Sequence, residues 1–358
     1  MKVVQLLPTI AFGDAIGNDT IAIKKILWEE GYDTEIYADI IDSRLPKGTA
    51  KSAELLSGLA ADDVLIYHAS TGTALNEKLP QYGGRQIMVY HNITPPSYFH
   101  EYNAQAEFNC EYGYRGMRFL ADKISCCIAD SEYNRQDLLK MGFTCPIDVC
   151  PILIPFDDYK KAPDTGVLRK YRSGGWQNLL FVGRIAPNKK HEDLIRAFYV
   201  YQRYYQPRSR LFLVGTAGGM EKYERQLKAY ISSLGLQDKI IFPGHIKFRE
   251  VLAYYYLADL FLCMSEHEGF CVPLVEAMYF QKPVVARSTT AVPETLGNGG
   301  LLLPDQDPKV AAAAIHRVLT DKSLNAYLRK KQQERLAEYK YEKVKMQLLQ
   351  IVHRVIGS

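Results

Sequence analysis

The chain has 358 residues, 47% of them hydrophobic and 23% charged, which is typical of a soluble globular protein and excludes a disordered one. This length suits two domains, and no apolar run approaches the roughly 18 to 20 residues that a membrane-spanning helix needs. The seven cysteines contain no C-x-x-C pair, a pattern that favours reduced thiols in a cytoplasmic protein over a disulfide framework or a zinc site.

The net charge of +4 conceals a difference between the two halves of the chain. Residues 1–155 carry 13 Lys and Arg against 20 Asp and Glu, whereas residues 156–358 carry 31 against 20. The second half is therefore expected to meet an anionic ligand, although part of its positive charge belongs to a solvated helix face after residue 321. Nucleic acid is not expected, because no compact basic stripe with interleaved aromatic residues is present.

Short apolar segments of strand length alternate with amphipathic segments of helix length. The first segment has neither the long apolar region nor the cleavage site of a signal peptide, and it is predicted to be a buried strand. The predicted strands are 2–7, 33–38, 63–69, 85–91, 123–129, 178–183, 209–215, 239–244, 257–264 and 282–287. The main predicted helices are 18–32, 131–143, 191–205 and 220–236.

This strand–helix alternation predicts an α/β fold with parallel sheets covered by helices on both faces. It occurs twice, on either side of a proline-containing crossover at 150–164, and so indicates two doubly wound, Rossmann-like domains that face each other across a cleft. The expected domains are 1–155 and 156–340. A final helix at 341–358 has no destination fixed by the sequence, and packing on the first domain is one option. Ligands are expected outside the carboxyl ends of the strands, in the cleft.

Glycine-containing turns follow three predicted strands, at 9–20, 181–195 and 212–223. None matches a P-loop or an intact dinucleotide-binding fingerprint, and each is a weak signal by itself. The second turn also carries Arg184 and Lys189. Both cations can project to the carboxyl end of the strand, where lysine and arginine bind phosphate oxygens, although two solvated loop cations are the plainer interpretation.

The stretch "SEHEGFCVPLVEAM" (265–278) holds two glutamates separated by seven residues. A strand is predicted to run into a loop and then into a short helix with Pro273 at its first position. The amides of Leu274 and Val275 at the helix start form an anion site. Glu276 beside this site suits the vicinal hydroxyls of a ribose, whereas Glu268 reaches another part of the ligand. The two acids therefore need not flank one bond.

This segment, E-G-F-x-x-P-x-x-E-A-M with its E-x7-E spacing, resembles the signature of the GT4 family of retaining glycosyltransferases, which have the GT-B fold. "VGRIAPNKKHEDLI" is similar to the donor-phosphate segment of the same family. Further similar segments lie at 89–99, 128–138 and 297–308, so that the resemblance covers nearly the whole chain. It implies that the first domain holds the acceptor and the second the nucleotide-sugar donor.

The resemblance also implies roles for individual residues. The implied catalytic residues are His91, Arg184, Lys189 and Glu268. The implied donor-binding residues are Gly13, Gly183, Arg184, Lys189, Glu268, Gly269, Phe270, Cys271, Val272, Leu274, Val275 and Glu276. Base recognition is expected at His245, Ile246 and Lys247, largely through the backbone, and no metal site is expected.

Several positions leave alternatives open. His91 at a strand end can also be a packed histidine. The first loop has Gly13-Asp14 in place of paired glycines, which leaves acceptor binding open. Cys271 stands where the family more often has glycine. In the D-x-D of Asp305 and Asp307, a helix N-cap at Asp307 is favoured over a metal site.

The function implied is transfer of a hexosyl group from a nucleotide-diphosphate sugar to a hydroxyl of a glycan or lipid-linked glycan, with retention at the anomeric carbon. A UDP-sugar donor is favoured and GDP-mannose is the main competitor. Polysaccharide biosynthesis in the cytoplasm, no cofactor, and at most peripheral membrane contact are expected. The alternatives are a sugar-nucleotide epimerase of the same fold and a catalytically silent nucleotide-sugar-binding subunit.

Overall fold

A computed structural model describes residues 1–172 and 174–357. The chain forms two compact units, and each is described by itself. Unit 1 comprises Met1–Ser97, Gln105–Phe156 and the C-terminal segment from Tyr339; unit 2 comprises Tyr98–Ala104 and Asp157–Glu338. The short segment Tyr98–Ala104 belongs to unit 2, a feature with no signal in the sequence pattern.

In the described residues, the sheet of unit 1 has seven parallel strands in the order β3-β2-β1-β4-β5-β6-β7. The strands are β1 (Val3–Ile10), β2 (Ile36–Ile41), β3 (Lys51–Ser52), β4 (Leu59–Ala69), β5 (Gly83–Tyr90), β6 (Cys126–Ala129) and β7 (Ile147–Val149). The helices are α1 (Ala15–Glu29), α2 (Leu75–Lys78), α3 (Ala104–Leu120), α4 (Glu132–Lys140) and α13 (Tyr341–Gly357). The direction of winding reverses between β1 and β4, which makes this the switch point of the sheet.

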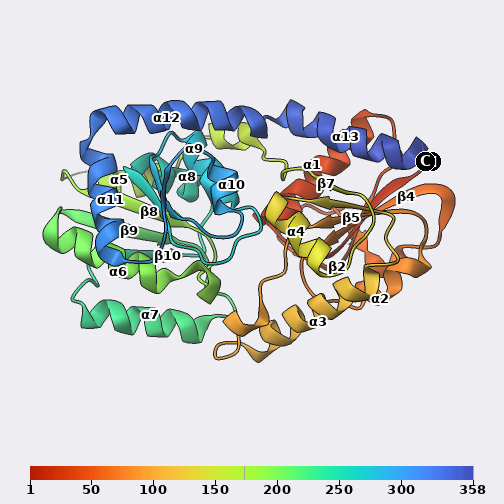
Figure 1. Cartoon of the computed structure of the whole chain (residues 1–358), viewed down its shortest axis with the longest axis horizontal. Coiled ribbons are helices and arrows are strands. Elements are labelled where there is room, and N and C mark those ends of the chain that lie inside the picture. Colours follow the sequence, from red (N-terminus) through yellow and green to blue (C-terminus); the bar gives the residue numbers. More distant parts are fainter. Residues whose placement is uncertain (173, 358) are drawn as a thin grey trace. The chain divides into compact units, whose positions relative to one another are not determined.

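The C-terminal helix α13 belongs to the core of unit 1 (Figure 1). Its buried face carries apolar residues at helical spacing, including Val344, Leu348 and Val352, and packs with Ile23 and Leu27 of α1. Burial of this apolar stripe supplies the main driving force for docking the helix. The last helix of the chain therefore completes the first unit.

In the described residues, the sheet of unit 2 has six parallel strands in the order β10-β9-β8-β11-β12-β13. The strands are β8 (Gln177–Val182), β9 (Ser209–Val214), β10 (Ile240–Gly244), β11 (Leu260–Cys263), β12 (Val284–Arg287) and β13 (Leu301–Leu303). The helices are α5 (Thr165–Arg172), α6 (His191–Tyr204), α7 (Glu221–Ser233), α8 (Phe248–Leu257), α9 (Val272–Tyr279), α10 (Val292–Leu296), α11 (Pro308–Thr320) and α12 (Lys322–Leu336). Short 3-10 turns lie at Ala53–Leu55, Leu79–Gln81, Pro96–Tyr98, Phe156–Lys160, Pro187–Lys189 and Ala337–Tyr339.

The predicted pair of doubly wound parallel sheets is confirmed, and the differences concern elements with weak patterns. The edge strands β3, β7 and β13 are two or three residues long, too short for an alternation to appear. Helix α3 has Gly113 and Gly116 on its buried face, where a Cβ on Gly116 would lie 2.2 Å from the Asn76 side chain. The same face of α3 also buries Met117 and Leu120, so the two glycines interrupt its apolar stripe. None of the helices in the described residues is long and apolar enough to cross a membrane.

Candidate donor site in the second unit

The candidate site lies at the carboxyl ends of β8 and β11, which are neighbours in the sheet of unit 2. The winding direction reverses between these two strands, and ligands of doubly wound sheets bind at such switch points. The loop after β8 carries Arg184 and Lys189, and the loop after β11 carries Glu268. The topology thus brings together residues that lie far apart in the sequence.

Lys189 and Glu268 form an ion pair in which Nζ lies 2.7 Å from Oε2. The Lys189 side chain is 20% exposed and that of Glu268 is 8% exposed. Burial alone would lower the pKa of Lys189, but the attraction of Glu268 outweighs it and raises the pKa above its ordinary value. Lys189 is therefore a cation whose side chain is partly exposed to solvent, as a group that binds an incoming anion must be.

Two residues that the sequence did not indicate hold these loops together. The Asn188 carbonyl accepts from the amide of Glu266 at 2.9 Å, and its side-chain amide donates to the His267 carbonyl at 3.1 Å. The hydroxyl of Thr290 accepts from the amide of Glu268 at 2.9 Å. These bonds are made to backbone groups, so they leave no signal in the spacing of chemically active side chains.

Glycine is required where the turns after β8 and β9 approach each other. A Cβ on Gly215 would lie only 1.9 Å from the carbonyl oxygen of Gly183, and both glycines have positive φ. Arg184 is exposed directly after Gly183. Lys190, next to Lys189, pairs with Glu266 at 3.1 Å and is 27% exposed.

The helix after the loop, α9, begins at Val272, so Pro273 occupies its second position rather than the predicted first. The Leu274 amide donates to the carbonyl of Cys271 at 3.0 Å, which corrects the expectation that this amide is free for an anion. Cys271 has a φ of 74°, in the left-handed region where glycine is favoured. Glycine would adopt this backbone conformation with less strain than cysteine does.

Glu276 is partly buried, and both of its carboxylate oxygens accept hydrogen bonds. The hydroxyl of Tyr159 lies 2.9 Å from Oε1 and that of Tyr255 lies 2.6 Å from Oε2. Burial raises the pKa of Glu276, and the two tyrosine bonds offset part of this rise. Sequence reasoning missed both tyrosines. Because a carboxylate has about four acceptor positions, two remain for other donors such as ribose hydroxyls.

The remaining predicted residues of unit 2 lie at the same edge of the sheet or next to it. Phe270 is 5% exposed, and its carbonyl accepts from the Thr295 hydroxyl at 2.5 Å. The predicted base-contacting loop follows β10, with His245 and Lys247 exposed and Ile246 partly buried. The other predicted donor-loop positions, Gly269, Val272 and Val275, follow Glu268 in the loop and the first turns of α9.

Some acidic and thiol groups of unit 2 could suggest a metal site, but each has another role or partner in the structure. Asp307 caps α11 by accepting from the Lys309 amide at 2.8 Å, which confirms the predicted cap. Ligand atoms of Cys263, Glu268 and Cys271 lie within 4.8 Å of one another, but Glu268 already has the Lys189 ammonium as its cation. The absence of a metal requirement stays a prediction.

Two predicted residues belong to unit 1. Gly13 is exposed after β1 with a φ of 76°. The His91 side chain, after β5, is 1% exposed. Its Nδ1 lies 2.9 Å from Asp130 and its Nε2 lies 2.9 Å from Nδ1 of His68. The ring thus has the surroundings of the packed histidine that was the alternative interpretation, and its contact with a sugar stays a prediction.

Comparison with known proteins supports a glycosyltransferase assignment. The family described as "Glycosyl transferases group 1" matches residues 173–342, nearly half of the chain. O-antigen chain mannosyltransferase B of Escherichia coli is 26% identical over 268 residues, which cover 72% of this chain and 66% of that protein. A D-inositol 3-phosphate glycosyltransferase of Kineococcus radiotolerans is 29% identical over 226 residues, 58% of this chain and 52% of that protein. The chain thus spans between half and two thirds of the length of these relatives.

Solved structures share the architecture over almost the entire chain. Sucrose-phosphate synthase from Thermosynechococcus elongatus has a TM-score of 0.76 and 18% identity, with 100% of both chains covered. Anabaena HepE in complex with UDP-glucose has a TM-score of 0.77 and 18% identity, covering 99% of this chain and 100% of that one. At this identity the likeness shows the fold alone, which is GT-B. The family match over residues 173–342, the curated relatives and the fold together support a GT4-like glycosyltransferase.

Proposed function

We propose that the chain transfers a hexosyl group from a nucleotide-diphosphate sugar to a hydroxyl acceptor, with retention at the anomeric carbon. The observation that carries this proposal is the partly open Lys189–Glu268 pair at the switch point of unit 2. A donor diphosphate offers Lys189 a stronger anionic partner, and the released Glu268 carboxylate then accepts hydrogen bonds from hydroxyls of the sugar. One ligand thus satisfies both members of the pair.

The reaction breaks the bond between the anomeric carbon and the β-phosphate oxygen, and negative charge accumulates on the leaving diphosphate. Arg184, Lys189 and the N-terminal end of α9 stabilise that charge, a contribution that usually dominates catalysis. The acceptor oxygen bonds to the anomeric carbon, and its proton passes to the leaving phosphate in a same-face reaction. A covalent carboxylate intermediate would also give retention.

The donor and acceptor are proposed from the relatives. UDP-glucose bound to HepE supports a UDP-sugar, and the mannosyltransferase relative makes GDP-mannose the competitor. A glycan or lipid-linked glycan acceptor, polysaccharide biosynthesis in the cytoplasm and at most peripheral contact with a membrane complete the proposal. The fixed cations replace the charge that a metal would supply, so no metal is required.

Incubation of the protein with UDP-glucose or GDP-mannose, without acceptor, tests the proposal. Transferases often leak to water, so slow release of free sugar and nucleoside diphosphate is expected. An isomerised nucleotide sugar would identify an epimerase, and an unchanged donor would indicate a silent binding subunit. Thermal shift identifies the base, because a nucleotide at 100 times its Kd adds roughly 2.7 kcal/mol to the unfolding free energy.

A further inference from the structure

A hydrogen-bonded row of buried polar side chains crosses neighbouring strands of unit 1. It runs from Gln5 on β1 through His68 on β4 to His91 after β5 and Asp130 after β6. Gln5 and His68 are 0% exposed and Asp130 is 2% exposed. Because these side chains are buried, each is expected to have a hydrogen-bond partner inside the protein.

One end of this row has a fixed orientation. The Gln5 side-chain NH2 donates to the Thr20 carbonyl at 3.0 Å, so its carbonyl oxygen faces His68 Nε2 at 2.9 Å. A carbonyl oxygen can only accept, and Nε2 of His68 must therefore carry a proton. A neutral His68 then has a bare Nδ1, which can only accept from His91.

At the other end, Nδ1 of His91 must also carry a proton. Nδ1 of His91 lies 2.9 Å from an Asp130 oxygen, and a carboxylate can only accept. His91 must consequently donate from both ring nitrogens, which only an imidazolium can do. A neutral His91 beside a protonated Asp130 would satisfy the same contacts. The ordinary pKa of histidine, however, exceeds that of aspartic acid by roughly 2.5 units, so the proton belongs on the ring.

The two ring nitrogens are as far apart as in a hydrogen bond and too close together for a metal ion to lie between them. The His68 and His91 rings are coplanar within 1°, with centroids 5.2 Å apart and Nδ1 and Nε2 2.9 Å apart. The centroid separation exceeds the N···N distance only by the two ring radii, so the nitrogens lie on the line that joins the centroids. A metal ion on that line needs about 2.0 to 2.1 Å to each nitrogen, which would place the nitrogens about 4 Å apart.

The surrounding charges favour a cation at His91. Burial alone would lower its pKa, but the nearby Asp130, and then Asp19 and Asp14 of the α1 region, raise it above the ordinary value. The pKa of His68 lies well below its ordinary value because of burial and the charge on His91. The two rings thus divide the roles of donor and acceptor.

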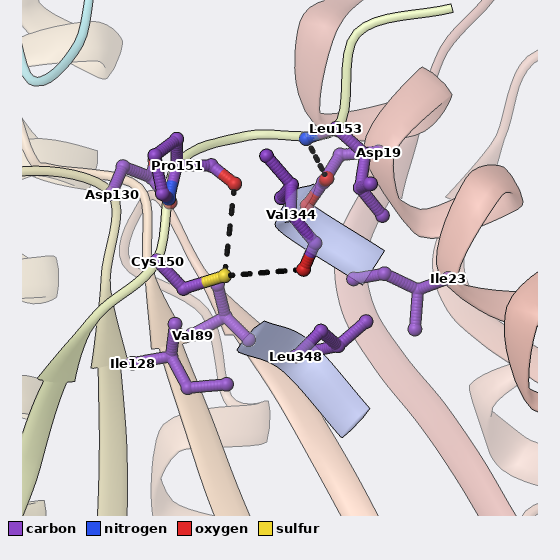
Figure 2. A pocket seen from close by; sticks show the side chains of 10 residues that line it. All are labelled: Asp19, Ile23, Val89, Ile128, Asp130, Cys150, Pro151, Leu153, Val344 and Leu348. Carbon is purple, nitrogen blue, oxygen red and sulfur yellow. Dashed lines mark hydrogen bonds between the residues drawn. The ribbon is translucent and has the colours of Figure 1, made fainter. Parts of the chain in front are cut away.

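A small cavity of about 10 Å³ separates Asp130 from Asp19 and the Cys150 thiol, with room for about one water molecule. Figure 2 shows Asp19 accepting from the Leu153 amide, at 2.8 Å, and the Cys150 thiol turned to backbone carbonyls. Burial raises the pKa of Asp19 to about 7 and raises that of Cys150. The cavity beside Asp130 is therefore lined by a carboxyl that is partly protonated near neutrality and by a neutral thiol.

We propose that His91 is a fixed imidazolium that donates one proton to Asp130 and the other to His68, and that Asp130 and His68 are the positioning residues that keep it charged. A histidine committed in this way cannot act as a general base. Under the proposed function, on which this consequence rests, His91 contributes positive charge and position. The epimerase alternative, which needs an acid–base group such as His91, loses that group.

NMR of the full-length protein, labelled with ¹⁵N at histidine, tests the protonation state without any catalytic assay. At pH 7.5 one histidine should show both ring nitrogens in the imidazolium range, and this signal should be missing from His91→Gln. A second should be the neutral Nε2–H tautomer, and it should be missing from His68→Gln. The proposal is overturned if every histidine is neutral at pH 7.5, or if the imidazolium signal belongs to another residue.

Asp130→Asn tests the positioning role. The asparagine NH2 can donate to a bare Nδ1 of His91, while Nε2 of a neutral His91 still donates to His68. Every hydrogen bond of the row is then kept, so the fold should be preserved. The pKa of His91 should fall by about 1 to 3 units, and its imidazolium signal should be replaced by a neutral one at pH 7.5. Asp137→Asn is the matched control, because Asp137 is a partly buried carboxylate of the same unit that accepts from Tyr90 at 2.7 Å.

The same two variants separate this inference from the proposed function. Donor hydrolysis by Asp130→Asn should decline as the pH rises from 6 to 9, whereas Asp137→Asn should follow the wild type. An unchanged imidazolium in Asp130→Asn, or equal pH profiles for the two variants, would overturn the positioning role. Failure of all variants and of the wild type to hydrolyse any donor would count against the proposed function while the NMR result still stands.

Discussion

The two units each hold a carboxylate–cation pair at the carboxyl end of a sheet, and the pairs differ in what remains for a ligand. In Lys189–Glu268 the side chains are 20% and 8% exposed, and among the residues that the structure describes Glu268 is the one carboxylate paired with the three-donor Lys189 ammonium. In His91–Asp130 the side chains are 1% and 2% exposed, and both ring nitrogens are engaged. The first pair can exchange partners when an anion arrives, whereas the second is saturated. Availability of donors, not the presence of an ion pair, therefore distinguishes a candidate binding group from a structural one.

The saturated pair should matter most for stability. Asp130→Ala leaves a buried imidazolium without its partner, and we expect the unfolding free energy to drop by about 3 to 5 kcal/mol. Lys189→Ala, at a pair with access to solvent, should lower it by less. Denaturant unfolding of both variants at pH 6.5 measures the difference. Equal losses would mean that the two pairs do not differ as described.

Asp19 lies across the small cavity from Asp130, and its protonation should make the stability of unit 1 depend on pH. Its pKa of about 7 exceeds the ordinary 3.8, so the folded state holds this proton more tightly than the unfolded chain does. Stability from this group is therefore present below about pH 4 and is lost as the pH rises towards 7. The loss amounts to at most about 4 kcal/mol.

Asp19→Asn keeps an acceptor for the Leu153 amide and removes the titration. Between pH 4 and 8 its unfolding free energy should therefore decrease less than that of the wild type. Asp14→Asn, a substitution at the N-cap of α1, is the control and should retain the wild-type slope. A wild-type slope in Asp19→Asn as well would show that Asp19 is ionised in the folded state.

The Lys189–Glu268 pair, which can exchange partners, should matter most for turnover. Lys189→Ala should lower kcat by about 10² or more, because it removes positive charge that faces the leaving phosphate. Lys190→Ala is the matched control: the neighbouring lysine pairs with Glu266 and should affect kcat little. Arg184→Ala should resemble Lys189→Ala. Near-normal kcat in Lys189→Ala and Arg184→Ala, measured with saturating donor, would refute the phosphate assignment.

The sequence predicted both sheets, because the buried parallel strands form apolar runs that alternate with amphipathic helices. It also predicted a ligand site outside the carboxyl ends of the strands, which is where the loops with Lys189 and Glu268 lie. It could not show that His91 is saturated. His68 looks like any residue of the run "LIYHA", and the pairing of β4 with β5 that brings the two rings together is a property of the sheet. The tyrosines that hold Glu276 were missed for the same reason, as they come from segments distant in sequence.

Substitution of Glu276 tests whether a carboxylate that already accepts two hydrogen bonds can still bind a ligand. Its effect on the kinetic constants should differ from that of a substitution at Glu268. Both oxygens of Glu276 are held by tyrosines, yet each has a lone pair left for a ribose hydroxyl. Ribose does not change during the reaction, so Glu276→Gln should raise the donor KM by about tenfold and leave kcat nearly unchanged. Glu268→Gln should mainly lower kcat, because the sugar ring changes in the transition state.

Two controls make the interpretation of Glu276 specific. A donor without the ribose 2′-hydroxyl should bind wild type more weakly, and Glu276→Gln should discriminate little between the two donors. Tyr159→Phe removes one hydrogen bond from Glu276 but no carboxylate, and it should therefore keep the preference for the 2′-hydroxyl. If Tyr159→Phe and Glu276→Gln lose donor affinity alike and wild type ignores the 2′-hydroxyl, then Glu276 is a structural anchor for the tyrosines. Unit 2 would then contain, like unit 1, a carboxylate whose partners leave nothing for a ligand.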